Sequence, residues 1–348
     1  MHISTLSPAK KMRSLKQKPS FYPMLLGFLV IISVLSLLFS FAVGFYFIPF
    51  EKILSSTKAY LEFGTISSEF IILYRVRLPR IIAAFVIGAA LSVSGSAYQG
   101  MFKNPLVSPD ILGVSSGAGF GAAWAIVLGW PYYMIQMTAF IFGLMVVFLS
   151  SMISRQVRFG QTLSLILAGT MFSALSSAGT TLLKYISEPS DALPAITFWL
   201  MGSLAKVSWS NLLFSLPPMM IGFVILYLLR WRLNLLTLGD EEARSLGMNP
   251  ARTRTLAILG ATFLSASAVC LGGLIGWVGL MIPHVARNII GPQYKRLLPI
   301  SALIGGCFLL IMDDLARSLF VMEIPLGVMT ACLGAPFFIT LIIKDRED

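Results

Sequence analysis

Long apolar segments alternate with short polar loops along most of this chain. A helix needs about 20 mostly apolar residues to cross the hydrocarbon core of a membrane. The pattern therefore predicts an all-α membrane protein with about ten transmembrane helices. The predicted spans are 22–47, 78–101, 109–129, 132–153, 162–186, 210–230, 253–272, 274–289, 297–320 and 325–343.

Two stretches do not fit this alternation. Residues 1–20 contain five basic residues and no apolar run, which indicates a solvated tail before a single membrane domain at 21–348. Residues 187–208 are apolar in part but are interrupted by Pro189 and Pro194. We expect an outer loop or a short interfacial helix there, with Trp199 at the depth that tryptophan prefers.

The basic residues predict the orientation of the chain. An even number of spans places both termini on one side, and most of the 26 basic residues then lie in the loops and tails of that side. The positive-inside rule assigns this side to the cytoplasm. Arg75, Arg77 and Arg80 are exceptions, because they cluster on the outer side. They predict an outer surface that attracts negative charge, unless they are arginines that reach from a helix end to the interface.

The composition excludes a soluble protein. Hydrophobic residues make up 57% of the chain and charged residues 12%, and the mean hydropathy is +0.84. The net charge of +11 is spread over loops between apolar spans, so it does not indicate nucleic-acid binding. The three cysteines lie within apolar segments without the spacing of a disulfide framework or a zinc site, and we expect no metal site.

Small residues recur every four positions in two successive spans. This spacing puts them on one face of each helix, where a second backbone can approach closely. Small residues are also common in membrane helices in general, which is the alternative reading. The predicted packing positions are Gly88, Ser92, Ser96, Gly113, Gly117 and Gly121.

The loop at about 238–254 is the most polar stretch of the second half. We expect a short helix that Asp240 caps, with acidic residues at the positive end of the helix dipole and Gly247 at its end. Ala243 and Leu246 are three residues apart and would share a face. The alternative is a solvated connector. The residues of this predicted docking helix are Asp240, Glu241, Glu242, Ala243, Leu246 and Gly247.

Several motifs occur in an order that resembles one family. They are RLPR at 77–80, GAALSVSGSAYQ at 88–99, NPL at 104–106, PDILGVSSGAG at 109–119, GLIGWVGLMIPHVAR at 273–287, IPLGV at 324–328 and LGAPFF at 333–338. Together they resemble the FecCD-like permeases of ATP-binding-cassette (ABC) importers, which carry iron-siderophores, haem or cobalamin. The loop at 238–254 is similar to the segment by which such permeases couple to their ATPase.

The resemblance implies roles for three groups of residues. Arg77, Arg80 and Arg317 would receive glutamates of a substrate-binding protein. The 238–254 loop would sit in a groove of the ATPase. An inner gate would be formed by Gln161, Thr162 and Leu163.

The resemblance also implies the partners and the location. We expect a multi-pass subunit of the bacterial inner membrane, surrounded by lipid, with a second permease chain that is a copy or a paralogue. Two ATPase subunits and an extracytoplasmic binding protein would complete the importer. The chain has no GxxxxGK[ST] phosphate loop, so ATP and Mg would bind the ATPase and no cofactor would bind here.

Three alternatives remain at this point. Gly113 to Gly117 fits the GxSxG pattern of serine hydrolases, with Ser115 as nucleophile and His284 as base. An ion-gradient-driven secondary transporter is the stronger rival, although the span centres contain few acidic residues. Within the family, the substrate could be an oxyanion such as molybdate. The sequence does not decide the substrate or the identity of the second permease chain.

Overall fold

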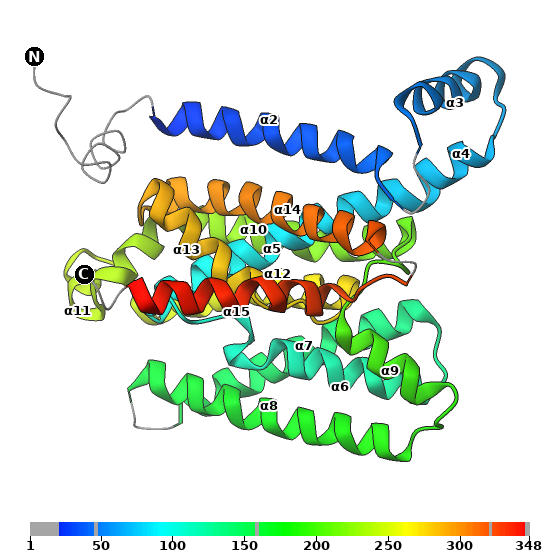
Figure 1. Cartoon of the computed structure of the whole chain (residues 1–348). Helices are drawn as coiled ribbons and strands as arrows, with labels where there is room; N and C mark the ends of the chain where they lie inside the picture. Colours follow the sequence, from blue (N-terminus) through cyan, green and yellow to red (C-terminus); the bar gives the residue numbers. More distant parts are fainter. Residues whose placement is uncertain (1–20, 45–47, 157–159, 320–321, 345–348) are drawn as a thin grey trace, which may run out of the picture.

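The computed structural model describes residues 21–44, 48–156, 160–319 and 322–344, and these residues form helices and loops without a strand. The basic tail at 1–20 lies outside the described residues. The helices run along one axis, and the start of α2, the helix α11 and the end of α15 lie at the same end of the bundle (Figure 1). In chain order the helical elements are α2 (Phe21–Ala42), α3 (Phe50–Phe63), α4 (Ser68–Ile71), η1 (Ile72–Arg77), α5 (Leu78–Met101), η2 (Pro109–Leu112), α6 (Val114–Val127), α7 (Tyr132–Ser154), α8 (Gln161–Ile186), α9 (Ala192–Met201), α10 (Trp209–Leu238), α11 (Asp240–Ser245), α12 (Pro250–Gly272), α13 (Val278–Ile290), α14 (Tyr294–Ser318) and α15 (Leu326–Lys344).

Each of the ten predicted spans contains a helix. Seven helical segments of the described chain are long and apolar enough to cross a membrane, whereas α6, α13 and the apolar part of α15 (Leu326–Thr340) are shorter. The number of ten crossings therefore stays a prediction. The stretch at 187–208 contains α9, a helix of 10 residues. The amphipathic helix α3 was not predicted, although Gly64 with φ +64° ends it at a left-handed position that favours glycine.

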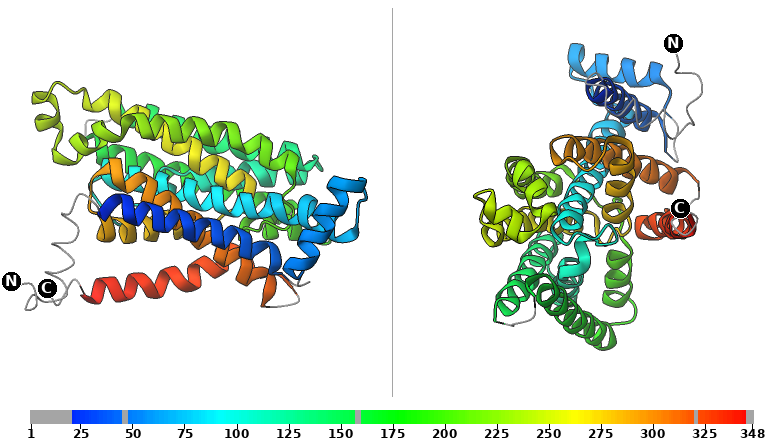
Figure 2. Two further views of the ribbon diagram at one scale, coloured as in Figure 1. Left: turned by 90° about the horizontal axis from the view of Figure 1, so that it is seen from above. Right: turned by 90° about the vertical axis from the view of Figure 1, so that its left-hand side faces the viewer.

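Helix α5 lies at the centre of the bundle. Twenty of its 24 residues are buried, and it contacts α10, α12, α13 and α14. Figure 2 shows it in cyan, surrounded by other helices in the end-on view. Because every side of α5 faces protein, its hydrophobic residues form no single apolar stripe, which is typical of a buried helix.

The central helix approaches its neighbours where it carries small residues. A Cβ atom on Gly88 would lie 2.1 Å from the carbonyl oxygen of Gly305 on α14. A Cβ on Gly95 would lie 1.8 Å from the carbonyl oxygen of Gly279 on α13. The hydroxyl of Ser96 donates to Ser301 of α14 at 3.1 Å. These contacts bring backbones together at distances that larger side chains would prevent.

The second group of small residues packs against α7. Cβ atoms on Gly117 and Gly121 would lie 2.7 and 2.6 Å from the carbonyl oxygens of Phe142 and Thr138, respectively. Gly113 has φ +84° and precedes α6. It therefore serves two purposes, because the turn needs a left-handed residue and Val146 leaves no room for a side chain.

We predict that Gly88→Ala destabilises the bundle by about 1–3 kcal/mol, because its methyl group would force α5 away from α14. The matched control is Gly27→Ala on α2, where a Cβ would meet no atom within 4 Å. The midpoint of thermal unfolding in detergent measures both effects. Equal midpoints for the two variants would contradict the close approach of α5 and α14.

Candidate functional site: two polar regions at opposite ends of the bundle

A cluster of charged residues lies at the end of the bundle that is remote from α11. It joins α2, the start of α5, the end of α14 and the segment before α15. Arg77, Arg80 and Arg317 are only 5–7% exposed, whereas Arg75 is exposed. The π-helical turn η1 runs directly into α5 and carries Arg75 and Arg77 on different faces.

Arg80 is bound by two carboxylates. Its Nε and Nη2 donate to Asp313 on α14 at 2.8–3.1 Å, and its Nη1 and Nη2 donate to Glu323 at 2.7 and 2.9 Å. The Asp313 side chain is fully buried, whereas that of Glu323 is 38% exposed. Two bidentate pairs therefore occupy both edges of one planar guanidinium.

Arg317 and Arg77 attach α2 to this cluster. Arg317 donates to Asp314 at 2.5 Å and to the carbonyl and hydroxyl of Ser40 at 2.7 and 2.6 Å. Arg77 donates to the carbonyl of Phe41. These bonds fix the end of α2, which packs along α14 through half-buried apolar side chains over the rest of its length.

The outer charge cluster, defined as Arg77, Arg80, Asp313, Asp314, Arg317 and Glu323, carries no formal net charge. The sequence prediction did not include this balance, in which three carboxylates lie beside the three guanidiniums, whereas exposed Arg75 lies outside the cluster. The sequence showed Asp313 and Asp314 one turn before Arg317, but it gave no sign of the pairs across 233 and 243 residues. Glu323 was missed as a partner of Arg80.

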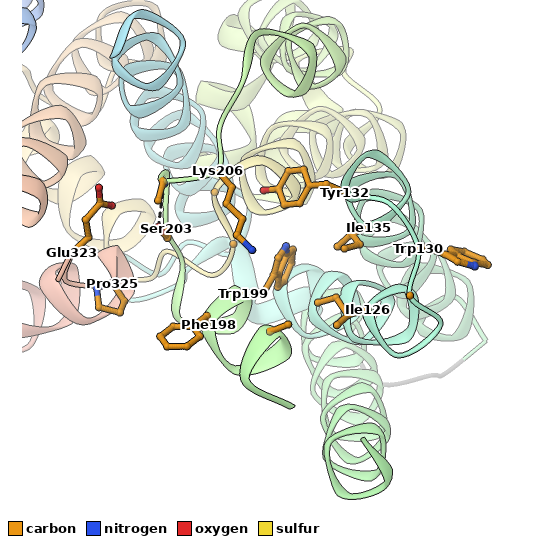
Figure 3. A pocket seen from close by; sticks show the side chains of 15 residues that line it. Ile126, Trp130, Tyr132, Ile135, Phe198, Trp199, Ser203, Lys206, Glu323 and Pro325 are labelled. Carbon is orange, nitrogen blue, oxygen red and sulfur yellow. Dashed lines mark hydrogen bonds between the residues drawn. The ribbon is translucent and has the colours of Figure 1, made fainter. Parts of the chain in front are cut away.

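A cavity of about 440 Å³ lies beside the outer charge cluster. Its walls come from the α6–α7 loop, α9, the turn at 203–206 and the segment at 323–325. Figure 3 shows Trp199, Tyr132 and Lys206 around it, with Glu323 and Pro325 at one side. The backbone N–H of Leu326 donates to the carbonyl of Gly202 at 2.9 Å, so the Glu323 segment is tied to the end of α9.

The second polar region is α11, at the opposite end. The prediction that Asp240 caps this helix is wrong, because Gly239 is the N-cap residue and Asp240 is the first residue of α11. The carboxylate of Asp240 instead accepts from Arg254 of α12 at 2.8 Å, and Arg254 is 4% exposed. The Asp240–Arg254 pair thus fixes α11 to the start of α12.

The end of α11 is a Schellman motif. The N–H of Gly247 donates to Arg244 and the N–H of Met248 donates to Ala243, with Gly247 at φ +78°. Ala243 is fully buried, whereas Leu246 is 60% exposed, so the expected shared face is absent. The exposed surface of this region is formed by Glu241, Glu242, Arg244, Ser245, Leu246 and Gly247.

The predicted gate residues are at the start of α8. Gln161 is its first residue, Thr162 is half-buried and Leu163 is 52% exposed. Along the rest of α8, an exposed stripe combines hydroxyl and apolar residues at helical spacing. It includes Leu163, Leu167, Thr170, Met171, Ala174, Ser177, Ala178 and Thr181.

The GxSxG segment has a different environment from a hydrolase site. The hydroxyl of Ser115 donates to the carboxylate of Asp110. The ring of His284 on α13 lies edge-on to Phe337, with ring centroids 6.4 Å apart. Ser115 is therefore held by a carboxylate at the η2–α6 turn, where small residues also serve packing.

Comparison with known proteins gives the family of this chain. The model of the FecCD transport family matches residues 29–344. The chain belongs to the FecCD transport family. It is a multi-pass membrane permease subunit of an ABC importer, and the motifs that indicated this family all lie within the matched residues.

Two relatives and one solved structure show the extent of the similarity. The molybdate import permease MolB of Haemophilus influenzae is 40% identical, over 94% of this chain and 97% of MolB. The hemin transport permease HmuU of Yersinia pestis is 37% identical, over 93% of this chain and 96% of HmuU. A solved structure described as an inward-facing conformation of a metal-chelate type ABC transporter has a TM-score of 0.83 and 39% identity, over 92% of this chain and 99% of that chain.

We predict that Asp313→Asn lowers the free energy of unfolding by about 3–5 kcal/mol, because it leaves buried Arg80 without its main counter-charge. The control is Glu62→Gln on α3, whose partner Lys58 is exposed and 3.6 Å away. That surface pair contributes less than about 1 kcal/mol. Unfolding by detergent titration compares the two variants, and similar losses would show that the outer charge cluster is not a stabilising centre.

Proposed function

We propose that this FecCD-family permease pairs with a second permease chain, binds two separate ATPase subunits through α11, and imports a metal chelate of the iron-siderophore, haem or cobalamin type. The observation that carries this proposal is the separation of two polar regions by an apolar bundle. Leu246 and the acids of α11 face outward at one end, and the outer charge cluster lies at the other. The bacterial inner membrane is the location that this function requires.

The shape of α11 supports a contact with an ATPase. Its buried side is locked by Ala243 and by the Asp240–Arg254 pair, while Leu246 extends from the Schellman turn. A partner that holds Leu246 in a groove would move α11 and the start of α12 as one body. ATP and Mg would bind that partner, and the motion of α12 would reach α5, which it contacts.

The exposed stripe of α8 supports a pathway between two permease chains. The hydroxyls of Thr170 and Thr181 donate to backbone carbonyls of α8 at 2.9 Å, and Ser177 adds a third hydroxyl to the same exposed face. Two such stripes that face each other would line a channel with both polar and apolar groups. Thr162 and Leu163 would then lie at its inner end, where the gate is proposed.

The substrate class rests on the family and on two relatives with different cargo. MolB is named for molybdate and HmuU for hemin. The metal-chelate description of the 39% identical structure favours a chelate for this chain. A molybdate-like oxyanion is the second candidate, and the 40% identity to MolB supports it. Uptake assays with radiolabelled iron chelate and molybdate separate the two.

The test of the assembly is native mass spectrometry of the chain purified from its own host. We predict a complex of two permease chains and two P-loop ATPase subunits. Leu246→Asp should remove the ATPases and leave the permease pair, because a charge replaces the exposed apolar contact of α11. The matched control, Leu61→Asp on α3, changes a 77% exposed leucine near the outer end and should leave the complex intact.

The outcomes of this experiment separate two failures. A wild-type chain that emerges without any ATPase would overturn the importer proposal and favour an ion-driven carrier. A wild-type complex that Leu246→Asp leaves unchanged would overturn only the role of α11. Copies with different masses at the permease position would identify a paralogue as the second chain.

We also propose that a carboxylate of the substrate-binding protein replaces Glu323 on Arg80 during docking. Glu323 is the partly exposed member of this pair, so its place can be taken from outside. Its displacement would move the 323–326 segment, which contacts the outer cavity and the end of α9. Docking would in this way change the structure at the outer end of the pathway.

Replacing Glu323 with glutamine should tighten docking of the copurifying binding protein by roughly tenfold, equal to about 1.4 kcal/mol, because it removes the competing charge. Glu188→Gln, at an exposed glutamate of the 187–190 loop, is the control. Surface plasmon resonance with permease in nanodiscs measures the dissociation constants. Weaker docking of Glu323→Gln would show that Glu323 supports the docking surface instead of competing for Arg80.

A further inference from the structure

An apolar cleft of about 480 Å³ lies between α7 and α12 at the α11 end of the bundle. Its walls are the last turns of α7 and the first turns of α12, with Leu165 of α8 behind them. Leu165 is 3% exposed, so the cleft is on a different side of α8 from the exposed stripe of the proposed pathway. The apolar wall residues are Leu144, Val147, Phe148, Met152, Leu165, Ile258, Leu259 and Phe263.

The rim of this cleft is basic and rich in hydroxyls. Two of its described lining residues are arginines and none is acidic; Arg254 is paired with Asp240 at 2.8 Å, so Arg155 supplies the net positive charge of the rim. Arg155 is exposed, and its Nη2 donates to the hydroxyl of Thr255 at 3.3 Å. Ser151 lies one turn before Arg155 on α7 and also lines the cleft. The charge is therefore at the level where α7 ends, and the apolar walls extend toward the middle of the bundle.

A basic rim above an apolar cleft matches the two parts of an anionic lipid, its head group and its acyl chain. Basic pockets between transmembrane helices on the cytoplasmic side recognise anionic lipid head groups. An apolar cleft that continues from such a pocket into the membrane accommodates an acyl chain, which a soluble anion does not have. A peptide would bring backbone N–H and C=O groups against walls that offer no hydrogen bonds.

We propose that the α7–α12 cleft binds one anionic phospholipid of the inner leaflet. Its phosphate lies at Arg155 and Thr255, and an acyl chain lies along Leu144, Phe148 and Phe263. Phosphatidylglycerol has the required chemistry, because its head group is anionic and carries hydroxyls for the serine and threonine of the rim. Neither the substrate nor the substrate-binding protein takes part in this site.

The lipid would also affect α11. Arg254 lines the same cleft and holds Asp240, the first residue of α11, at 2.8 Å. A lipid that fills the space between α7 and α12 restrains the start of α12, on which Arg254 lies. The position of α11 would thus depend on the lipid through Arg254. Through this residue, the lipid composition of the membrane would affect the proposed ATPase contact.

The experiment uses the full chain in mixed micelles with equal amounts of phosphatidylglycerol and phosphatidylcholine of matched chains. Native mass spectrometry gives the ratio of the two lipids that remain bound. We expect wild type to retain phosphatidylglycerol preferentially and Arg155→Gln to lower this ratio roughly fivefold, as expected for one arginine near a lipid head group. Arg232→Gln is the control, since Arg232 is exposed near the end of α10 and does not line the cleft.

A second variant tests the apolar part. Ser151→Phe places a ring in the cleft and should lower the total amount of bound lipid. Its midpoint of thermal unfolding should stay above the temperature of the binding measurement, so that the variant is still folded. Equal ratios in wild type and Arg155→Gln would overturn the site, and so would an equal fall in Arg232→Gln, which would indicate general charge attraction. Displacement of phosphatidylglycerol by inorganic phosphate would assign the rim to a soluble anion and overturn the lipid.

Discussion

Close approach of backbones around α5 is the constraint on which the rest of this structure depends. Lipid gives apolar helices no hydrophobic reason to associate, so a membrane bundle is held by packing and by hydrogen bonds between helices. Gly88 and Gly95 let α14 and α13 come within reach of the α5 backbone. These close approaches place α5 at the centre of the bundle. The charged start of α5 then lies at the outer end of the bundle.

The central position of α5 buries Arg80, and the outer charge cluster supplies the counter-charges that this arginine needs. A buried arginine needs counter-charges with good geometry, and Arg80 receives them from Asp313 and Glu323. The same cluster ties the end of α2 and the segment before α15 to the bundle. The structural ion-pair network and the proposed docking surface thus share residues, and partly exposed Glu323 is the residue that a carboxylate of the binding protein would replace.

At the inner end, an ion pair also connects two elements, here α11 and α12. Asp240 and Arg254 connect α11 to α12, while the cleft beside Arg254 opens between α7 and α12. A partner at Leu246 and a lipid at Arg155 would both act on the start of α12. Because α12 contacts α5, the two ends of the permease are joined through the central helix.

The sequence by itself determined the apolar spans, the small-residue faces and the family, because hydropathy, four-residue spacing and ordered motifs are local properties that tertiary context does not alter. It placed the acids of α11 and the left-handed Gly247 close to where they lie. Only the tertiary structure decided that Arg80 meets Asp313 and Glu323, that Asp240 pairs with Arg254 instead of capping its helix, and that α3 forms. Pairs across more than 200 residues depend on how helices assemble, and neither a charge pattern nor a motif records which buried arginine faces which carboxylate.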